Sequence, residues 1–296
     1  MTSLRMTSLS WRIILLLGGL MLWPWAKSQA QPTHRAIAVG VESIRIADED
    51  DGIDHDEPYL IVTRFQFRVR LDAAGRLTLV PGTLSVTNIM SGHNNLGRRD
   101  DNWAAEGNTY TLPKGHPRYA QAMFPWGEEY WVLGVVITHL EEDGFAYSTA
   151  KLLGDRIRDA VETALRDGSF DAADARQLSS AIIRKVSRDL SRAAGRFDVG
   201  GIIRGLASKA DPDDYGGTQV VAAVTAPGNR VFLYSGAPTT DAATLLRNTR
   251  ELGNGTHSLS LKFPAGDLSH LPWNARFCGE HSVNLKVSVW EQGTLY

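Results

Sequence analysis

Residues 48–62, DEDDGIDHDEPYLIV, place a dense group of carboxylates directly before an apolar strand. Seven acidic side chains fall within residues 48–57. Carboxylates this close repel one another and raise one another's pKa unless a cation or water separates them. A hard cation such as calcium, which binds carboxylate and carbonyl oxygens, suits such a group. The alternative is a solvated acidic turn between two strands.

A second acidic cluster is divided by a helical segment. Glu141, Glu142 and Asp143 follow an apolar strand, and residues 211–217, DPDDYGG, precede another strand. If the helical segment leaves and re-enters a β domain through one loop, its two feet lie close together and the two halves of the cluster meet. Antiparallel sandwiches gather alternate loops at the same end. Residues 48–57 are therefore expected beside the second cluster.

These loops resemble those of the C-two domain, the calcium-dependent sandwich first named in protein kinase C. The resemblance rests on Asp56-Glu57-Pro58-Tyr59 before one strand and on Asp213-Asp214-Tyr215-Gly216 before another. It spans residues 36–69 and 132–224, and it departs from the family in the helical insertion and in the irregular region 91–125. In that family, aspartates of two such loops bind calcium. The resemblance implies a calcium site made by Asp50, Asp56, Asp143, Asp213 and Asp214.

Other metal and catalytic motifs fit less well. An EF-hand with Gly52 at its sixth position would have Ala47 and Pro58 where the first and last ligands belong. The eight histidines are scattered, and no HExxH, GxSxG or P-loop motif occurs. Aspartates grouped with histidines can also hold two metals for phosphoester hydrolysis. A binding protein is favoured, and a metal-dependent hydrolase that uses the same acidic clusters is the alternative.

Strand patterns occupy most of the chain on both sides of the helical segment. Apolar residues alternate or form short runs at residues 36–46, 59–69, 77–80, 84–89, 130–140, 218–225, 230–234, 257–263 and 282–290. The region 91–125 is rich in Gly, Asn, Asp and Pro, which is typical of long loops with short strands at most. The predicted fold is mainly β with an α insertion, an antiparallel β-sandwich that carries a helical hairpin.

The insertion, at about residues 148–210, has two amphipathic helical patterns. In the first, which ends at Asp167-Gly168, the apolar positions are Leu152, Leu153, Ile157, Val161 and Leu165. In the second, they are Leu178, Ile182, Val186 and Leu190. Each apolar stripe must be covered, so the two helices are expected to pack as an antiparallel hairpin on the β domain.

The second helix also has a basic face, made by Arg184, Lys185, Arg188, Arg192 and Arg196. Such a face suits an anionic membrane surface or the acidic surface of a partner protein. A solvated face balanced by Asp189 and Asp198 is the other interpretation. The net charge of −2 gives no general attraction for nucleic acid, so no nucleic-acid partner is expected.

Residues 1–30 have the order of a secretory signal peptide. Arg5 and Arg12 precede an apolar run, and Ser28-Gln29-Ala30 supplies small residues for cleavage. The run is shorter than the roughly 20 residues that cross a bilayer, which disfavours an uncleaved anchor. The single cysteine, Cys278, excludes an intrachain disulfide framework. We expect a signal peptide over residues 1–30 and a single β-sandwich domain over residues 31–296, in a secreted or periplasmic protein.

Overall fold

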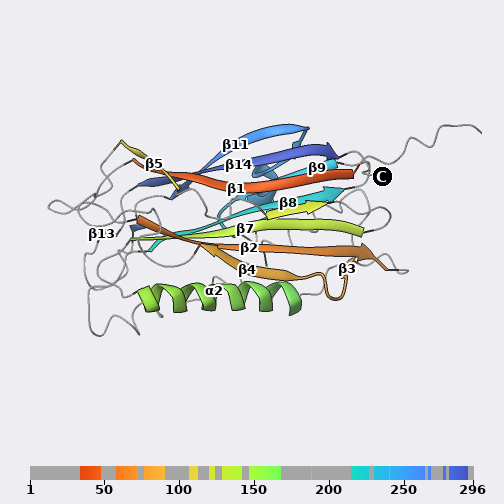
Figure 1. Ribbon diagram of the computed structural model, residues 1–296, viewed down its shortest axis with the longest axis horizontal. Helices are drawn as coiled ribbons and strands as arrows, with labels where there is room; N and C mark the ends of the chain where they lie inside the picture. The colour runs from red at the N-terminus through yellow and green to blue at the C-terminus, as the bar shows by residue number, and fades with distance from the viewer. Residues whose placement is uncertain are drawn as a thin grey trace, which may run out of the picture.

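The computed structural model gives the described part of the chain two large antiparallel sheets, one long helix and one short helix (Figure 1). It describes residues 34–47, 58–72, 77–90, 107–112, 120–123, 129–141, 147–167, 188, 215–226, 230–239, 241–263, 266–267, 276–277 and 280–292. The prediction of a mainly β chain with antiparallel sheets is confirmed.

The first sheet, called here the β1 sheet, has five strands in the order β11-β14-β1-β5, and β6 also pairs with β1. The bounds of its strands are β1 (His34–Ile46), β5 (Thr109–Thr111), β6 (Ala120–Met123), β11 (Gly255–Phe263) and β14 (His281–Gln292). The alternation in β1 changes phase because its register with β14 shifts between Val41 and Ser43. This irregularity keeps both Val41 and Ile44 buried in the core.

The second sheet, called here the β7 sheet, has seven strands in the order β10-β9-β8-β7-β2-β3, and β4 also pairs with β2. The bounds of its strands are β2 (Pro58–Leu71), β3 (Leu77–Leu79), β4 (Ser85–Met90), β7 (Glu129–Glu141), β8 (Tyr215–Ala226), β9 (Arg230–Gly236) and β10 (Thr249–Leu252). A separate two-stranded ribbon joins β12 (Gly266–Asp267) to β13 (Arg276–Phe277).

Strand β7 is apolar on both faces because it lies between two layers of core. Its odd-numbered residues, such as Leu133, Val135 and Ile137, pack with side chains of the β1 sheet. Its even-numbered residues Val136 and Leu140 belong to a second cluster on the opposite face. This explains why the sequence of β7 reads as a continuous apolar run rather than as an alternation.

Helix α2 (Tyr147–Asp167) covers that opposite face of the β7 sheet, next to β2 and β4 (Figure 1). Its buried stripe consists of Leu153, Ile157, Val161 and Leu165. The inclusion of Leu152 in this stripe was wrong, since its exposed fraction is 44%. Consecutive helical residues point about 100° apart, and Leu152 lies on the side of Leu153 that turns away from the sheet. The expected second helix lies outside the described residues except for Arg188, which is helical.

A short helix that the sequence patterns did not predict, α5 (Ala242–Arg247), lies between β9 and β10. Asp241 caps its first turn by accepting a hydrogen bond of 2.8 Å from the backbone nitrogen of Thr244. Leu245 is its buried residue. The helix lies in the connection that returns the chain from β9 to β10 at the sheet edge.

Candidate functional site

The strand ends that flank the acidic segments lie together at one end of the β7 sheet. Pro58, which begins β2, is paired with Glu141, which ends β7. Leu140 is paired with Tyr215, which begins β8. The segments that precede β2, follow β7 and precede β8 therefore leave from three adjacent strands. The expectation that the two feet of the helical segment lie close together is confirmed by the β7 and β8 pairing.

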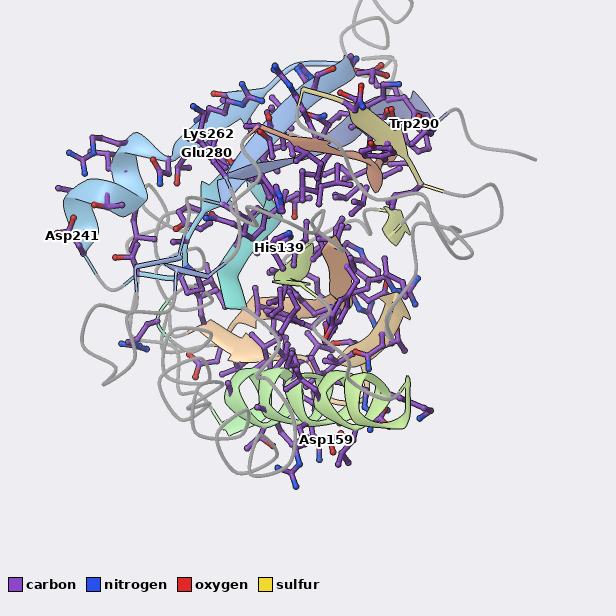
Figure 2. The ribbon with its side chains drawn as sticks, turned by 90° about the vertical axis from the view of Figure 1, so that its left-hand side faces the viewer. His139, Asp159, Asp241, Lys262, Glu280 and Trp290 are labelled. Carbon is purple, nitrogen blue, oxygen red and sulfur yellow. The ribbon has the colours of Figure 1, made fainter. Side chains whose placement is uncertain are left out.

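The β1 sheet contributes its own strand ends at the same place. Ile46, which ends β1, is paired with His281, which begins β14. The backbone nitrogen of Ala47 donates a 2.7 Å hydrogen bond to the carbonyl of Glu280. We call this part of the molecule, where β1 and β7 end and β2, β8 and β14 begin, the His139 end. Figure 2 views the molecule from this end and labels His139.

The five predicted calcium ligands, Asp50, Asp56, Asp143, Asp213 and Asp214, lie outside the described residues. The calcium site therefore stays a prediction. Within the ranges that the structure describes, no three or more His, Cys, Asp or Glu side chains form a group that could hold a metal ion. The strand ends are the part of the predicted site that the structure defines.

A pair of buried histidines joins the two sheets at the His139 end. Nδ1 of His281 lies 2.7 Å from Nε2 of His139, within hydrogen-bond distance. The rings meet edge to face, with centroids 4.6 Å apart and planes at 76°. Phe263 packs beside them, with its centroid 5.3 Å from that of His139. Both imidazoles have an exposed fraction of 0%, so the pair belongs to the interior between the sheets.

Strand alternation explains why these two rings meet. His139 continues the series of β7 residues that face the β1 sheet, after Leu133, Val135 and Ile137. His281 begins the corresponding series of β14, which continues with Val283. A polar side chain at each of these positions needs a hydrogen-bond partner once it is buried. The bond between the two rings meets part of that need.

Burial and the neighbouring His281 imidazole hold the pKa of His139 well below its ordinary value. Burial acts because an imidazolium loses its hydration there, and His281 acts because a second positive charge nearby opposes protonation. At neutral pH His139 is therefore uncharged. In the hydrogen bond between the rings one nitrogen donates and the other accepts, which two fully protonated rings could not do.

Two further polar contacts lie on the strands next to the pair. The hydroxyls of Thr138 and Thr218 lie 3.1 Å apart across β7 and β8. The side-chain nitrogen of Gln219 donates a 3.1 Å hydrogen bond to the carbonyl of Lys262, which links β8 to β11 in the other sheet. Side-chain hydrogen bonds thus tie the two sheets together at this end at more than one point.

The histidine pair was not predicted from the sequence, which showed only scattered histidines. One signal was present, since His139 stands in an otherwise apolar run and His281 stands in phase with the aliphatic alternation of β14. That signal identifies two buried histidines but not their contact, because the contact depends on how strands 142 residues apart are paired. The pair is a feature of the tertiary structure rather than of any motif.

The basic face of the predicted second helix is represented among the described residues by Arg188 alone. Its role in binding a membrane surface or a partner protein stays a prediction. In the part of the chain that the structure describes, no helix combines the length and the apolar character that a bilayer span requires.

Comparison of the chain with known protein families, with curated proteins and with solved structures finds no match.

Proposed function

We propose that this chain is an exported binding protein that holds calcium at the His139 end of a C-two-like β-sandwich. The proposed ligands are Asp50, Asp56, Asp143, Asp213 and Asp214. The observation that carries the proposal is the adjacency of three strand ends, in which Pro58 faces Glu141 and Leu140 faces Tyr215.

The chain itself limits how far the proposed ligands lie from these strand ends. Asp56 stands two residues before Pro58, and Asp143 stands two residues after Glu141. Asp214 directly precedes Tyr215. Since an extended chain spans at most about 3.6 Å per residue, the Cα atom of each aspartate can lie at most about 7 Å from the Cα atom of its strand end. Three strands therefore bring acidic residues to one end of the sheet.

A bound calcium ion accounts for acidic residues gathered at one end of the sheet better than carboxylates separated only by water do. Two carboxylates held about 4 Å apart near a protein surface repel by about 4 kcal/mol, and each further carboxylate adds to that repulsion. Calcium coordinates 6–8 oxygens in flexible geometry, which suits ligands that come from separate loops. An exported protein also meets calcium at concentrations that saturate weak sites, with dissociation constants of about 10⁻⁴ to 10⁻³ M.

The sandwich part of the proposal is supported by the shared core between the sheets. One buried cluster includes Ile37 and Val39 of β1, Leu285 of β14 and Leu133 and Val221 of the β7 sheet. The layers in Figure 1 follow one another as the β1 sheet, the β7 sheet and α2. We further propose that the second helix completes a hairpin with α2, since its apolar stripe also requires cover.

A thermal melt of the mature protein tests the calcium site. Millimolar calcium should raise the melting temperature relative to chelator, and Asp56→Asn and Asp214→Asn should each reduce that rise. Asp159→Asn is the matched control because Asp159 lies on the side of α2 away from the sheets (Figure 2). Its carboxylate pairs with Arg158. Equal melting temperatures in calcium and in chelator would reject the calcium site.

The hydrolase alternative is tested on the same protein. A catalytic metal site needs an open coordination position beside a bound substrate, whereas a structural calcium site is closed by protein ligands. The protein is assayed for hydrolysis of a generic phosphoester in the presence of calcium, manganese or zinc. Hydrolysis that is abolished by Asp56→Asn and not by Asp159→Asn would show that the site is catalytic. No turnover together with a calcium-dependent melt is the expected result.

A further inference from the structure

Strand β11 is the outermost strand of the β1 sheet. All nine of its residues, from Gly255 to Phe263, pair with β14 along one edge. Among the residues that the structure describes, no strand pairs with the other edge, and Figure 1 shows β11 along the upper border of the sheet. The side-chain nitrogen of Gln219 donates to the carbonyl of Lys262 near one end of the strand. The rest of this edge presents backbone N–H and C=O groups that another strand can bind.

Other outer strands are protected against such pairing. Strands β3 and β5 have only three residues each. Strand β10 has four residues, lies beside α5 and carries the charged side chains of Arg250 and Glu251. Glu251 also forms an ion pair of 2.6 Å with Arg230. Short strands, charged side chains and a neighbouring helix are the usual devices that prevent sheet edges from pairing.

Strand β11 has few of these devices. It has nine residues, no proline and an unbroken register with β14. Its only Lys, Arg, Asp or Glu residue is Lys262, which already pairs with Glu280 at 3.8 Å (Figure 2). An open edge of this length and composition favours the addition of another strand.

The side chains of β11 also suit such an addition. Leu261 and Phe263 are buried in the core between the sheets, whereas Leu259 packs on the margin of this core and is only partly buried. A strand added at the open edge would cover Leu259, and it would extend both the backbone ladder and the apolar layer. The residues on the outer face of β11 are small or polar and exposed: Thr256, Ser258, Ser260 and Lys262.

We propose that β11 pairs in an antiparallel manner with β11 of a second copy of this chain, so that the two β1 sheets join into one continuous sheet. The two-fold axis passes between the Leu259 residues of the two copies. In this register all nine residues of each strand are paired, from Gly255 opposite Phe263 to Phe263 opposite Gly255. A shift in either direction would leave residues at the ends unpaired.

The charges of β11 are compatible with a second copy in this register. Lys262 lies opposite Thr256 of the copy, so no like charges face each other across the strands. Ser258 lies opposite Ser260, and their hydroxyls can form hydrogen bonds across the interface. The two Leu259 side chains meet at the axis and cover each other. The net charge of −2 adds little repulsion between the copies.

The pairing goes beyond the proposed calcium site and does not use it. All measurements are therefore made in chelator, so that a failure of the calcium proposal leaves the result unchanged. Sedimentation of the mature protein at increasing concentration should give a mass that approaches twice that of one chain. A chain that stays monomeric at every concentration would overturn the proposal.

A charge variant tests whether β11 is the interface. In the double variant with Ser258→Lys and Ser260→Lys, the new lysines of one copy face those of the other. The dissociation constant of the dimer should rise by about tenfold or more, because like charges are brought together. The control with Leu152→Lys and Thr163→Lys adds the same charge at exposed positions of α2, on the far side of the β7 sheet, and should dimerise as the parent does. Equal dissociation constants for the β11 variant and the parent would contradict pairing through β11.

Disulfide formation between two different variants tests the register. Ser258→Cys and Ser260→Cys are made separately in a Cys278→Ser background, which removes the single native thiol. Residues directly opposite in an antiparallel pair have Cα atoms about 4.5–5.5 Å apart, a distance that a disulfide can bridge. Within either variant alone the cysteines lie diagonally, about 7–8 Å apart, which is too far without movement of the backbone.

Mild oxidation of the mixed variants should therefore give more disulfide-linked dimer than oxidation of either variant alone. This result needs no loss of stability in any variant, so it decides the matter even if the lysine variant does not fold. A mixture that forms no more linked dimer than the separate variants would show that the two β11 strands do not pair in this register.

Discussion

Gly134 of β7 lies so close to Val221 of β8 that a Cβ atom on residue 134 would come within 2.1 Å of the Val221 carbonyl oxygen. It would also approach Cζ of Phe65 to 2.7 Å. Both distances are shorter than van der Waals contact, and the first involves backbone that cannot rotate away. Glycine is therefore required here by the spacing of the strands.

Gly134→Ala is accordingly expected to cost at least the 1–3 kcal/mol or so that is typical of overpacked cores. Urea unfolding measures the change in the free energy of unfolding. Gly253→Ala is the control, since a Cβ there meets nothing within 4 Å. It should change stability by less than about 0.5 kcal/mol. An equal cost at both positions would show that the close approach of β7 and β8 is absent in solution.

Two aliphatic residues of α2, one buried and one exposed, give a second matched pair. Ile157 is buried against the β7 sheet, whereas Leu152 is 44% exposed. Ile157→Asp should destabilise by several kcal/mol because it buries an unpaired carboxylate. Leu152→Asp should be nearly neutral in the same denaturation measurement. Similar losses would mean that α2 is rotated relative to the sheet.

The pH dependence of stability follows from the lowered pKa of His139. Below about pH 6.5 the unfolded chain binds a proton at this histidine and the folded chain does not, so stability falls as pH decreases. The slope from one such group is at most about 1.4 kcal/mol per pH unit, and it ends at the lowered pKa of the folded state. Urea melts of the parent from about pH 7.5 to pH 5.5 should show this decline in the free energy of unfolding. A flat profile would contradict the buried, neutral state of His139.

Calcium should produce a modest stabilisation if its site is weak. For a dissociation constant of about 10⁻⁴ to 10⁻³ M, calcium at about 2 mM adds roughly 0.6–1.8 kcal/mol to the free energy of unfolding. That corresponds to a rise of a few degrees in melting temperature for a chain of this size. Magnesium at the same concentration should give less, because its smaller octahedral shell fits loop carboxylates less well. Equal effects of the two ions would indicate general screening of the acidic segments.

Removal of residues 1–30 on export is a separate expectation. N-terminal sequencing of protein recovered from the periplasm or the medium should find a mature chain that begins near Gln31. Recovery there of protein that still begins at Met1 would contradict it.

The strands were largely predictable from the sequence because alternation is a local property. The patterns at 36–46, 130–140 and 282–290 correspond to β1, β7 and β14. Helix α5 was not predicted, because six residues with one buried leucine give too little periodicity. The distinction between Leu152 and Leu153 required knowing which face of α2 the sheet covers.

The order of the strands and the contact between the two histidines could not be predicted from local sequence patterns. Pairing of Pro58 with Glu141, or of Ile46 with His281, joins residues far apart in the chain, and no local spacing specifies such partners. The acidic segments were expected to meet because of how antiparallel loops are arranged. The strand ends that flank them lie together, and the segments themselves lie outside the described residues. His139 and His281 are adjacent because the strand pairing within each sheet places them at the same level in the core between the two sheets.

The pairing of β1 with β14 has a consequence for how the chain folds during synthesis. His34 lies opposite Gln292, so the β1 sheet closes between strands from opposite ends of the described sequence. Loop-closure entropy makes such pairings slow to form. Until β14 has emerged, β1 lacks its principal neighbour and the apolar residues Ile37 and Val39 lack the β14 part of their core. In a nascent chain at this stage the β14 side of β1 is unpaired, and apolar strand edges exposed in this way are prone to aggregate and are bound by chaperones.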